Sequence, residues 1–271
     1  MRNKIISRKS NGLAAAIIFV MCSMMTSGCF FAFEEIRGSG DVVREERQVR
    51  NFSGVKVCNQ GDLKIELGDK EQLIIEAEDN LMEYIDTWVE DGVLKIGTKR
   101  NINLRNKKAI RYYLTAKSLD YLGVSSSGSI TAPKMKADDF SVRISSSGDI
   151  KVDAIEAESV SVGVSSSGEV YIGELNADEL SVRISSSGDI EIDEGRVKEQ
   201  TVHISSSGHY DGRDVESLSA DVKISSSGNA RIWAKDYLDA DLSSSGDLYY
   251  RGDPEKFSQR ESSSGKVRRL R

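Results

Sequence analysis

The stretch "VRISSSGDI", residues 142–150, occurs again letter for letter at residues 182–190. Its tetrapeptide Ser-Ser-Ser-Gly is found eight times, starting at Ser125, Ser145, Ser165, Ser185, Ser205, Ser225, Ser243 and Ser262. The spacing between starts is 20 residues five times, then 18 and then 19. A fixed period in this range is typical of repeat proteins in which each repeat stacks on its neighbours.

Apolar and polar residues alternate around each tetrapeptide. From Phe140 to Val152 the even positions read Phe, Val, Ile, Ser, Gly, Ile and Val, and the odd positions are polar or charged. Strict alternation predicts a β-strand with one buried face. At the 20-residue period, equivalent positions form columns of like residues: Val142, Val162, Val182, Val202 and Val222. We therefore predict an all-β fold, a right-handed parallel β-solenoid with about 20 residues per rung.

The same alternation points the middle serine and the glycine of each copy inward. We predict that they form a sharp corner where only a hydroxymethyl group or a hydrogen fits, and where glycine adopts unusual backbone angles. An inward hydroxyl needs a partner, so we expect a hydrogen bond to the next rung with a net value of about 0.5–1.5 kcal/mol. The predicted serine ladder is Ser126, Ser146, Ser166, Ser186, Ser206, Ser226 and Ser244. The predicted corner glycines are Gly128, Gly148, Gly168, Gly188, Gly208, Gly228 and Gly246.

Both ends of the array depart from the regular pattern. The last copy places Phe257, Gln259, Glu261 and Ser263 at inward positions, and this polar replacement suits a terminal cap. An earlier copy without the serine motif, "VKVCNQGDLKIE" at residues 55–66, aligns with "VRISSSGDIKVD". Between the two, strand-like runs are separated by "DNLMEYIDTWVEDG", from which we expect a helical turn and a hairpin; the runs are residues 73–77, 93–98 and 110–116. We predict irregular, wider rungs over residues 38–124 and a regular solenoid with its C-terminal cap over residues 125–271.

The first residues indicate export. Four basic residues precede an apolar run from Leu13 to Met25, which is short for a membrane span but suits a signal peptide. The run ends in "TSGC", which resembles the lipobox of bacterial lipoproteins, although Thr26 stands where that pattern prefers leucine. We predict that residues 1–28 are a signal peptide cleaved before a lipidated Cys29, and that residues 29–37 are a short linker. The alternative is ordinary cleavage nearby and a soluble secreted product.

Cysteines and charge exclude several kinds of site. Cys22 lies in the predicted signal peptide and Cys29 is the predicted lipidation site, so Cys58 is the one ordinary thiol and an intrachain disulfide or a cysteine zinc site is not expected. Removal of the four positive charges of residues 1–28 changes the formal net charge from −6 to −10. An acidic surface argues against nucleic acid as a partner.

Residues with a possible metal-binding or catalytic role lie in the outward-facing columns, and each can also be explained by a purely structural role. Asp149, Glu169 and Asp189 follow successive corner glycines and are weak candidates for a calcium site, because hard cations bind carboxylate oxygens. A solvated charged face is the favoured interpretation. The two histidines, His203 and His209, flank a serine motif, but the other copies lack a histidine, so we expect structural serines and no catalytic residue. No cofactor is expected, since no nucleotide-binding motif is present.

Short motifs and aromatic residues give weaker signals. "SSGK" at residues 263–266 and "RGD" at residues 251–253 are short enough to arise by chance. Tyr171 and Tyr249 have outward parity in adjacent columns, which would suit stacking against a glycan. Other aromatic candidates are Tyr210, Trp233 and Tyr250.

The segment "GSGDVVREERQVRNFSGVKV" at residues 38–57, followed by "GDLKIELGDKEQLIIEAEDNLMEYIDTWVEDGVLKIGTK" at residues 61–99 and by the serine array, resembles the head GIN domain family. That family consists of exported bacterial proteins described as auto-transporter adhesin heads, many of them lipoproteins. The resemblance covers most of residues 38–265 and implies a β-solenoid. It supplies no catalytic residues.

These observations lead to an expected function. We expect a non-enzymatic structural or adhesion-type binding module of the cell envelope, attached to the outer membrane through its N-terminal lipid and facing the periplasm or the cell surface. One alternative is a carbohydrate-binding or carbohydrate-active β-helix protein, and another is a periplasmic sensor or assembly partner that binds protein. The sequence does not identify a glycan or protein ligand.

Overall fold

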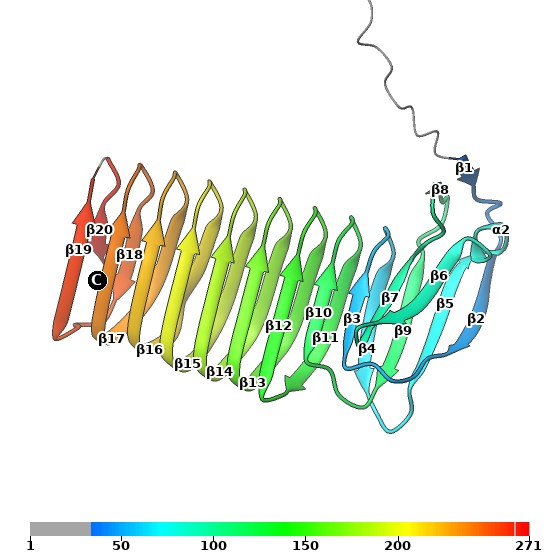
Figure 1. Ribbon diagram of the computed structural model, residues 1–271, viewed down its shortest axis with the longest axis horizontal. Helices are drawn as coiled ribbons and strands as arrows, with labels where there is room; N and C mark the ends of the chain where they lie inside the picture. Colours follow the sequence, from blue (N-terminus) through cyan, green and yellow to red (C-terminus); the bar gives the residue numbers. More distant parts are fainter. Residues whose placement is uncertain (1–33, 263, 271) are drawn as a thin grey trace, which may run out of the picture.

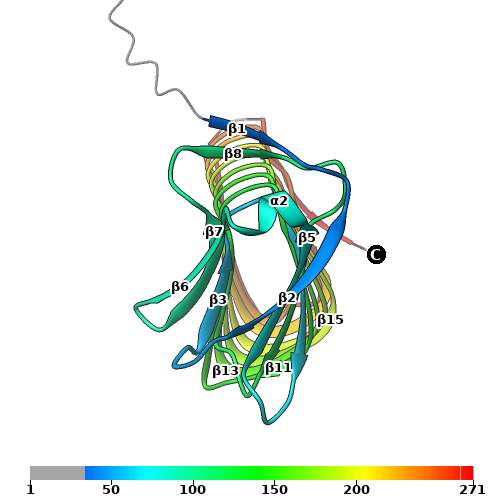
Figure 2. The same cartoon turned by 90° about the vertical axis from the view of Figure 1, so that its right-hand side faces the viewer.

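The structure is a computed structural model that describes residues 34–262 and 264–270. The predicted signal peptide and Cys29 lie outside the described residues. The chain forms the predicted right-handed parallel β-solenoid, in which stacked coils make an elongated rod (Figure 1). Seen along the rod, each coil is a flattened loop with two facing sides (Figure 2). Among the described residues, no helix has the length and apolarity needed to cross a membrane.

Four long strands make the regular middle of the rod. Each runs from one Ser-Ser-Ser-Gly bend to the next, and the strands are β13 (Asp149–Val164), β14 (Glu169–Ile184), β15 (Asp189–Ile204) and β16 (His209–Ile224). Neighbours pair in parallel with a 20-residue offset, so that Val162 lies opposite Val182 and Val182 opposite Val202. These valines are completely buried, because strict alternation turns every second side chain into the coil.

Shorter strands continue the stack on both sides. On the N-terminal side these are β10 (Tyr121–Val124), β11 (Ser129–Lys136) and β12 (Asp139–Ile144). On the C-terminal side they are β17 (Asn229–Leu242), β18 (Leu248–Arg251), β19 (Lys256–Glu261) and β20 (Val267–Arg269). Every residue of β19 is exposed, which is consistent with a polar last rung.

The segment at residues 55–66 forms a rung of its own, from β3 (Gly54–Val57) and β4 (Asp62–Leu67). Val55 pairs with Leu122 and Leu63 pairs with Ile130, so this rung stacks directly beneath the serine array. The next rung in chain order does not follow in space. It consists of β7 (Val93–Thr98) and β9 (Arg111–Ala116), which pair with the opposite edges of β3 and β4. The rung that comes later in the chain therefore lies nearer the N-terminal end of the rod than the rung that comes earlier.

Antiparallel strands cover this outer end, where the sequence predicted wider rungs with a helical turn and one hairpin. Strand β5 (Gln72–Glu78) pairs with β9, β2 (Val42–Gln48) pairs with β5, and β6 (Ile85–Glu90) forms a hairpin with β7. The expected helical turn is α2 (Asp79–Met82), and the expected hairpin turns at Asp91 and Gly92. Edge strands with free N–H and C=O groups invite further pairing, so the antiparallel strands protect the N-terminal edge of the parallel stack.

The segment predicted as a linker contains ordered structure. Its last four residues form β1 (Glu34–Arg37), which pairs in parallel with β8 (Ile102–Arg105). The two strands lie together at the N-terminal end of the rod, as Figures 1 and 2 show.

Candidate binding groove

The central serines of the bends are half buried rather than fully inside the coil. The structure places Ser126, Ser146, Ser166, Ser186, Ser206, Ser226 and Ser244 between the buried apolar column and the exposed serines beside them. Within residues 34–262 and 264–270, none of their hydroxyls makes a protein hydrogen bond, so the predicted ladder of bonded hydroxyls is not formed. Instead the backbone joins the bends, since the Ser165 N–H donates to the Ile144 carbonyl at 2.9 Å. Because these hydroxyls are only half buried, they do not need the protein partner that a fully buried hydroxyl would need.

The corner glycines are all buried, and the bend has no room for a side chain at these positions, but they do not adopt the unusual backbone angles that were also predicted. The described glycines with a positive φ angle are Gly40, Gly92 and Gly252, none of which is a corner glycine. A Cβ atom on Gly148 would lie 2.2 Å from the carbonyl oxygen of Gly128 and 2.9 Å from that of Ser126. Each bend therefore rests on the carbonyl groups of the bend before it, and the same contact recurs at Gly168, Gly188, Gly208, Gly228 and Gly246.

The weak calcium candidates are not gathered into a metal site. Among the described residues there is no group of three or more His, Cys, Asp and Glu side chains arranged to hold a metal ion. The carboxylate of Asp149 accepts a hydrogen bond from the Glu169 N–H at 3.3 Å, and that of Asp189 accepts one from the His209 N–H at 3.1 Å. Asp149 and Asp189 thus accept hydrogen bonds from the backbone of the following rung.

The histidines are not paired with a serine nucleophile. The His209 Nδ1 atom lies 3.6 Å from Asp189 Oδ1, and burial lowers the pKa of His203. In the part of the chain that is described, no serine hydroxyl donates to either ring. The RGD side chains are also engaged, because Arg251 pairs with Asp214 and Asp253 pairs with Arg269.

The two tyrosines with outward parity have cations over their rings. The Lys151 ammonium lies 4.9 Å from the ring centroid of Tyr171, and the Tyr171 hydroxyl donates to Asp193, which raises the tyrosine pKa. Arg231 and Arg268 approach the ring of Tyr249 at 6.0 and 5.7 Å. These rings already make cation–π contacts, which leaves less free aromatic surface for a ligand than the sequence implied.

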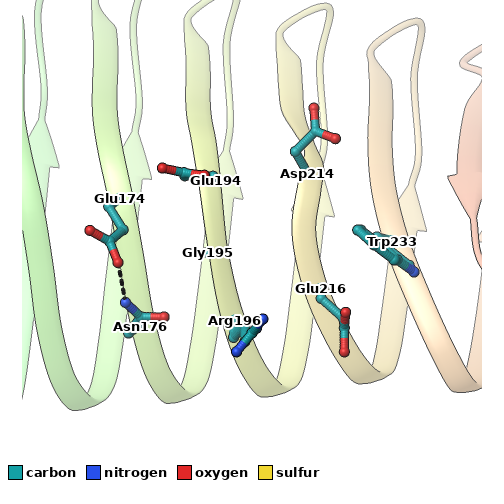
Figure 3. A pocket seen from close by; sticks show the side chains of 8 residues that line it. All are labelled: Glu174, Asn176, Glu194, Gly195, Arg196, Asp214, Glu216 and Trp233. Atoms are coloured by element: carbon teal, nitrogen blue, oxygen red, sulfur yellow. Dashed lines mark hydrogen bonds between the residues drawn. The ribbon is translucent and has the colours of Figure 1, made fainter.

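A different surface brings several acidic side chains together beside a tryptophan. A groove with a volume of about 500 Å³ crosses β14 to β17 near the bend opposite the serines (Figure 3). Two columns line it, and Gly195 lies between them. One column is Glu174, Glu194 and Asp214, and the other is Asn176, Arg196, Glu216 and Trp233. Asp153 and Asp193 extend the hollow along the neighbouring column.

Two irregularities of the sequence create this groove. Gly195 lies opposite Leu175 on one side and Val215 on the other, so it interrupts a column of inward apolar side chains. A Cβ atom on Gly195 would be 2.0 Å from the Leu175 carbonyl oxygen, which shows how closely the two backbones approach. The register between β16 and β17 then shifts between Asp211 and Glu216, as the 18-residue spacing requires. The shift brings Trp233 opposite Glu216.

Trp233 is fixed at the C-terminal end of the groove. Its indole is half buried, and its carbonyl accepts a 2.6 Å hydrogen bond from the buried Ser217 hydroxyl. Sequence reasoning named Trp233 among the aromatic candidates but missed the acidic residues around it. The sequence did contain a signal for these acidic residues. Glu174, Glu194 and Asp214 recur at 20-residue spacing, and glycine replaces the apolar residue at the neighbouring position 195.

The chain matches one known protein family over most of its length. Residues 51–173 and 158–254 match the family described as "Putative auto-transporter adhesin, head GIN domain". The chain belongs to this family. The head GIN domain model thus spans the early rungs, the serine array and the groove. No curated protein matches the chain significantly.

Solved structures share the fold. A crystal structure from Parabacteroides distasonis described as a "putative lipid binding protein" is 26% identical, with a TM-score of 0.81 over 88% of this chain and 100% of that chain. One from Parabacteroides merdae described as a "putative adhesin" is 22% identical, with a TM-score of 0.82 over the same shares. A second P. distasonis structure, also described as a "putative adhesin", is 21% identical, with a TM-score of 0.74.

Proposed function

We propose that the protein is a non-enzymatic, adhesion-type binding module of the cell envelope, anchored to the outer membrane by lipid on Cys29. The family description and the descriptions of similar structures support the adhesion part of this proposal. The basic residues, apolar run and "TSGC" of the first 29 residues support the anchor. One or two acyl chains would attach the protein firmly without a spanning helix, because each buried methylene contributes about 0.8 kcal/mol.

The position of β1 is the observation that carries this proposal. Strand β1 begins at Glu34, five positions after Cys29, and it lies at one end of the rod while β20 lies at the other (Figure 1). Five residues span at most about 17 Å. A lipid on Cys29 would therefore hold the rod by its N-terminal end, and the groove and the last rungs would be directed away from the membrane. A rigid rod held at one end suits a module that presents a binding surface at a distance.

The arrangement of polar side chains supports a non-enzymatic role. Charged residues on the outer columns pair with neighbours one rung away, as Lys136 does with Glu156 at 2.7 Å and Arg231 with Asp211 at 3.0 Å. Such ladders neutralise adjacent columns and stabilise the sheet modestly. Within the described residues, neither histidine ring is hydrogen-bonded to a serine hydroxyl, as a base that activates a serine nucleophile would be.

A carbohydrate-binding module is the second candidate function, and Trp233 favours it. An indole beside carboxylates can stack against a sugar ring while the carboxylates accept hydrogen bonds from its hydroxyl groups. The groove offers this combination on one surface.

The anchor and the attachment can be tested in cells. We expect the wild-type chain to incorporate radiolabelled fatty acid and to fractionate with the outer membrane, and the Cys29→Ser chain to do neither. Protease treatment of intact cells should remove the protein if it faces the surface. Attachment of cells to immobilised host proteins and to a glycan array should fall when the gene is deleted and return with the wild-type chain. Unlabelled wild-type protein would refute the anchor, and unchanged attachment would refute adhesion.

A further inference from the structure

The groove beside Trp233 is lined mainly by negative charge. The groove and the hollow that extends it are lined together by residues from β13 to β17, and among these described lining residues Arg196 is the one cation. The acidic lining residues are Asp153, Glu174, Asp193, Glu194, Asp214 and Glu216. A hollow lined by one sign of charge raises the local concentration of ligands of the opposite sign.

Most of this charge is not neutralised by the protein itself. Asp214 pairs with Arg251, and Glu216 lies 4.0 Å from the Lys235 ammonium. In the described part of the chain, the other four acids, Asp153, Glu174, Asp193 and Glu194, have no lysine or arginine partner. Glu174 accepts only the Asn176 amide at 2.7 Å, and it lies in register with Glu194 on the next rung. Directly opposed like charges are unfavourable in a sheet, and a bound cation would relieve them.

The shape of the groove favours an extended ligand. From Glu174 to Trp233 it crosses four successive strands (Figure 3), which correspond to three rung steps of about 4.8 Å, or roughly 14 Å. Trp233 closes one end with a partly exposed indole. An indole face attracts ammonium and guanidinium groups, so it would extend the preference for cations beyond the carboxylates.

We propose that this groove binds a lysine- or arginine-bearing extended segment of a partner protein. The inference rests on the proposed function, because it names the class of partner that an adhesion-type module would hold. The cationic side chains lie along Glu174, Glu194 and Asp153, and one contacts the indole of Trp233. Charge complementarity and the open, elongated shape favour such a segment over a neutral sugar polymer.

Binding is measured with the purified, detergent-solubilised protein and a fluorescent hexalysine peptide, with hexaglutamate as the charge control. We expect hexalysine to bind and hexaglutamate not to bind. The affinity for hexalysine should fall as salt is raised, because the Debye screening length decreases to about 10 Å at 0.1 M salt. The chain has two tryptophans, so a Trp88→Phe variant leaves Trp233 as the emitting residue. Its emission should change on saturation with hexalysine.

A matched pair of double variants separates the groove from overall acidity. Glu174→Gln with Glu194→Gln removes two groove charges from β14 and β15 and should weaken hexalysine binding roughly fivefold. Glu179→Gln with Glu199→Gln removes two exposed, in-register charges from the same strands outside the groove and should change affinity less than about twofold. Trp233→Leu should weaken binding roughly threefold. Thermal unfolding of each variant confirms that it is folded.

Several results would overturn the inference. Equal weakening in the two double variants would show that net charge alone binds the peptide. An unchanged Trp233 emission would place the peptide elsewhere, and tighter binding of a chitosan oligosaccharide than of hexalysine would favour a glycan. Cell attachment is scored separately: peptide binding without attachment refutes the proposed function, whereas attachment without peptide binding refutes the groove assignment.

Discussion

A Cβ atom on Gly168 would lie 2.2 Å from the carbonyl oxygen of Gly148, one rung below it. Real Cβ atoms do not approach backbone so closely, so the two bends stack only because position 168 has no side chain. The glycine of the repeated tetrapeptide is therefore required for the packing of one rung on the next.

Gly168→Ala should destabilise the protein by about 1–3 kcal/mol, because the new methyl group meets rigid backbone and the Ile144 side chain. Gly163, in β13 just before the same bend, is the control, since a Cβ there would meet chiefly the movable guanidinium of Arg143. Urea denaturation measures both variants. Similar unfolding free energies for the two alanine variants would contradict the packing explanation.

Ser186→Leu should lower the melting temperature more than Ser185→Leu. Ser186 is half buried in the bend, whereas Ser185 is exposed. Overpacking at the first position costs about 1–3 kcal/mol, while an exposed change usually stays within about 0.5 kcal/mol. Scanning calorimetry of both variants tests this, and equal melting temperatures would show that the central serine does not lean into the coil.

Gln200 and Tyr210 form a polar pair inside the coil, and their variants should not be additive. The Gln200 amide donates to the Tyr210 hydroxyl at 2.9 Å, and both side chains are 1% exposed. Tyr210→Phe leaves the amide unpaired and should cost about 1–3 kcal/mol. The double variant Gln200→Leu with Tyr210→Phe removes both polar groups and should recover part of this loss. A double-mutant cycle by urea denaturation measures the coupling, and strictly additive losses would refute it.

Stability should fall at alkaline pH because two tyrosines are buried. Burial raises the pKa of Tyr112 and Tyr210 well above the usual value near 10. The folded state then holds these protons more tightly than the unfolded state, so the stabilisation is complete below about pH 10 and is lost as pH rises further. Unfolding free energies measured from about pH 8 to pH 11 should decline less steeply for Tyr210→Phe than for wild type. Identical slopes would contradict this.

Local patterns were enough to predict the array, because period and alternation act within and between adjacent rungs. The columns through Val142 and Ile144 pair as their 20-residue spacing indicates, and the copy at residues 55–66 stacks beneath them. The narrow space at the corner glycines was predicted together with unusual backbone angles, but the atoms that fill this space, the carbonyl oxygens of the preceding rung, were not identified. The alternation of residues within one rung does not reveal where the carbonyl groups of the rung below lie.

The sequence by itself determined the coil, since residues that alternate and recur every 20 positions can bury their apolar face only by stacking on one another. The tertiary structure alone decided the reversed order of the first rungs, their antiparallel cover and the groove beside Trp233. The physical reason is that these features depend on contacts between residues far apart in the chain and on breaks in the repeat, at Gly195 and at the 18-residue rung, whose consequences appear only when neighbouring rungs are packed together.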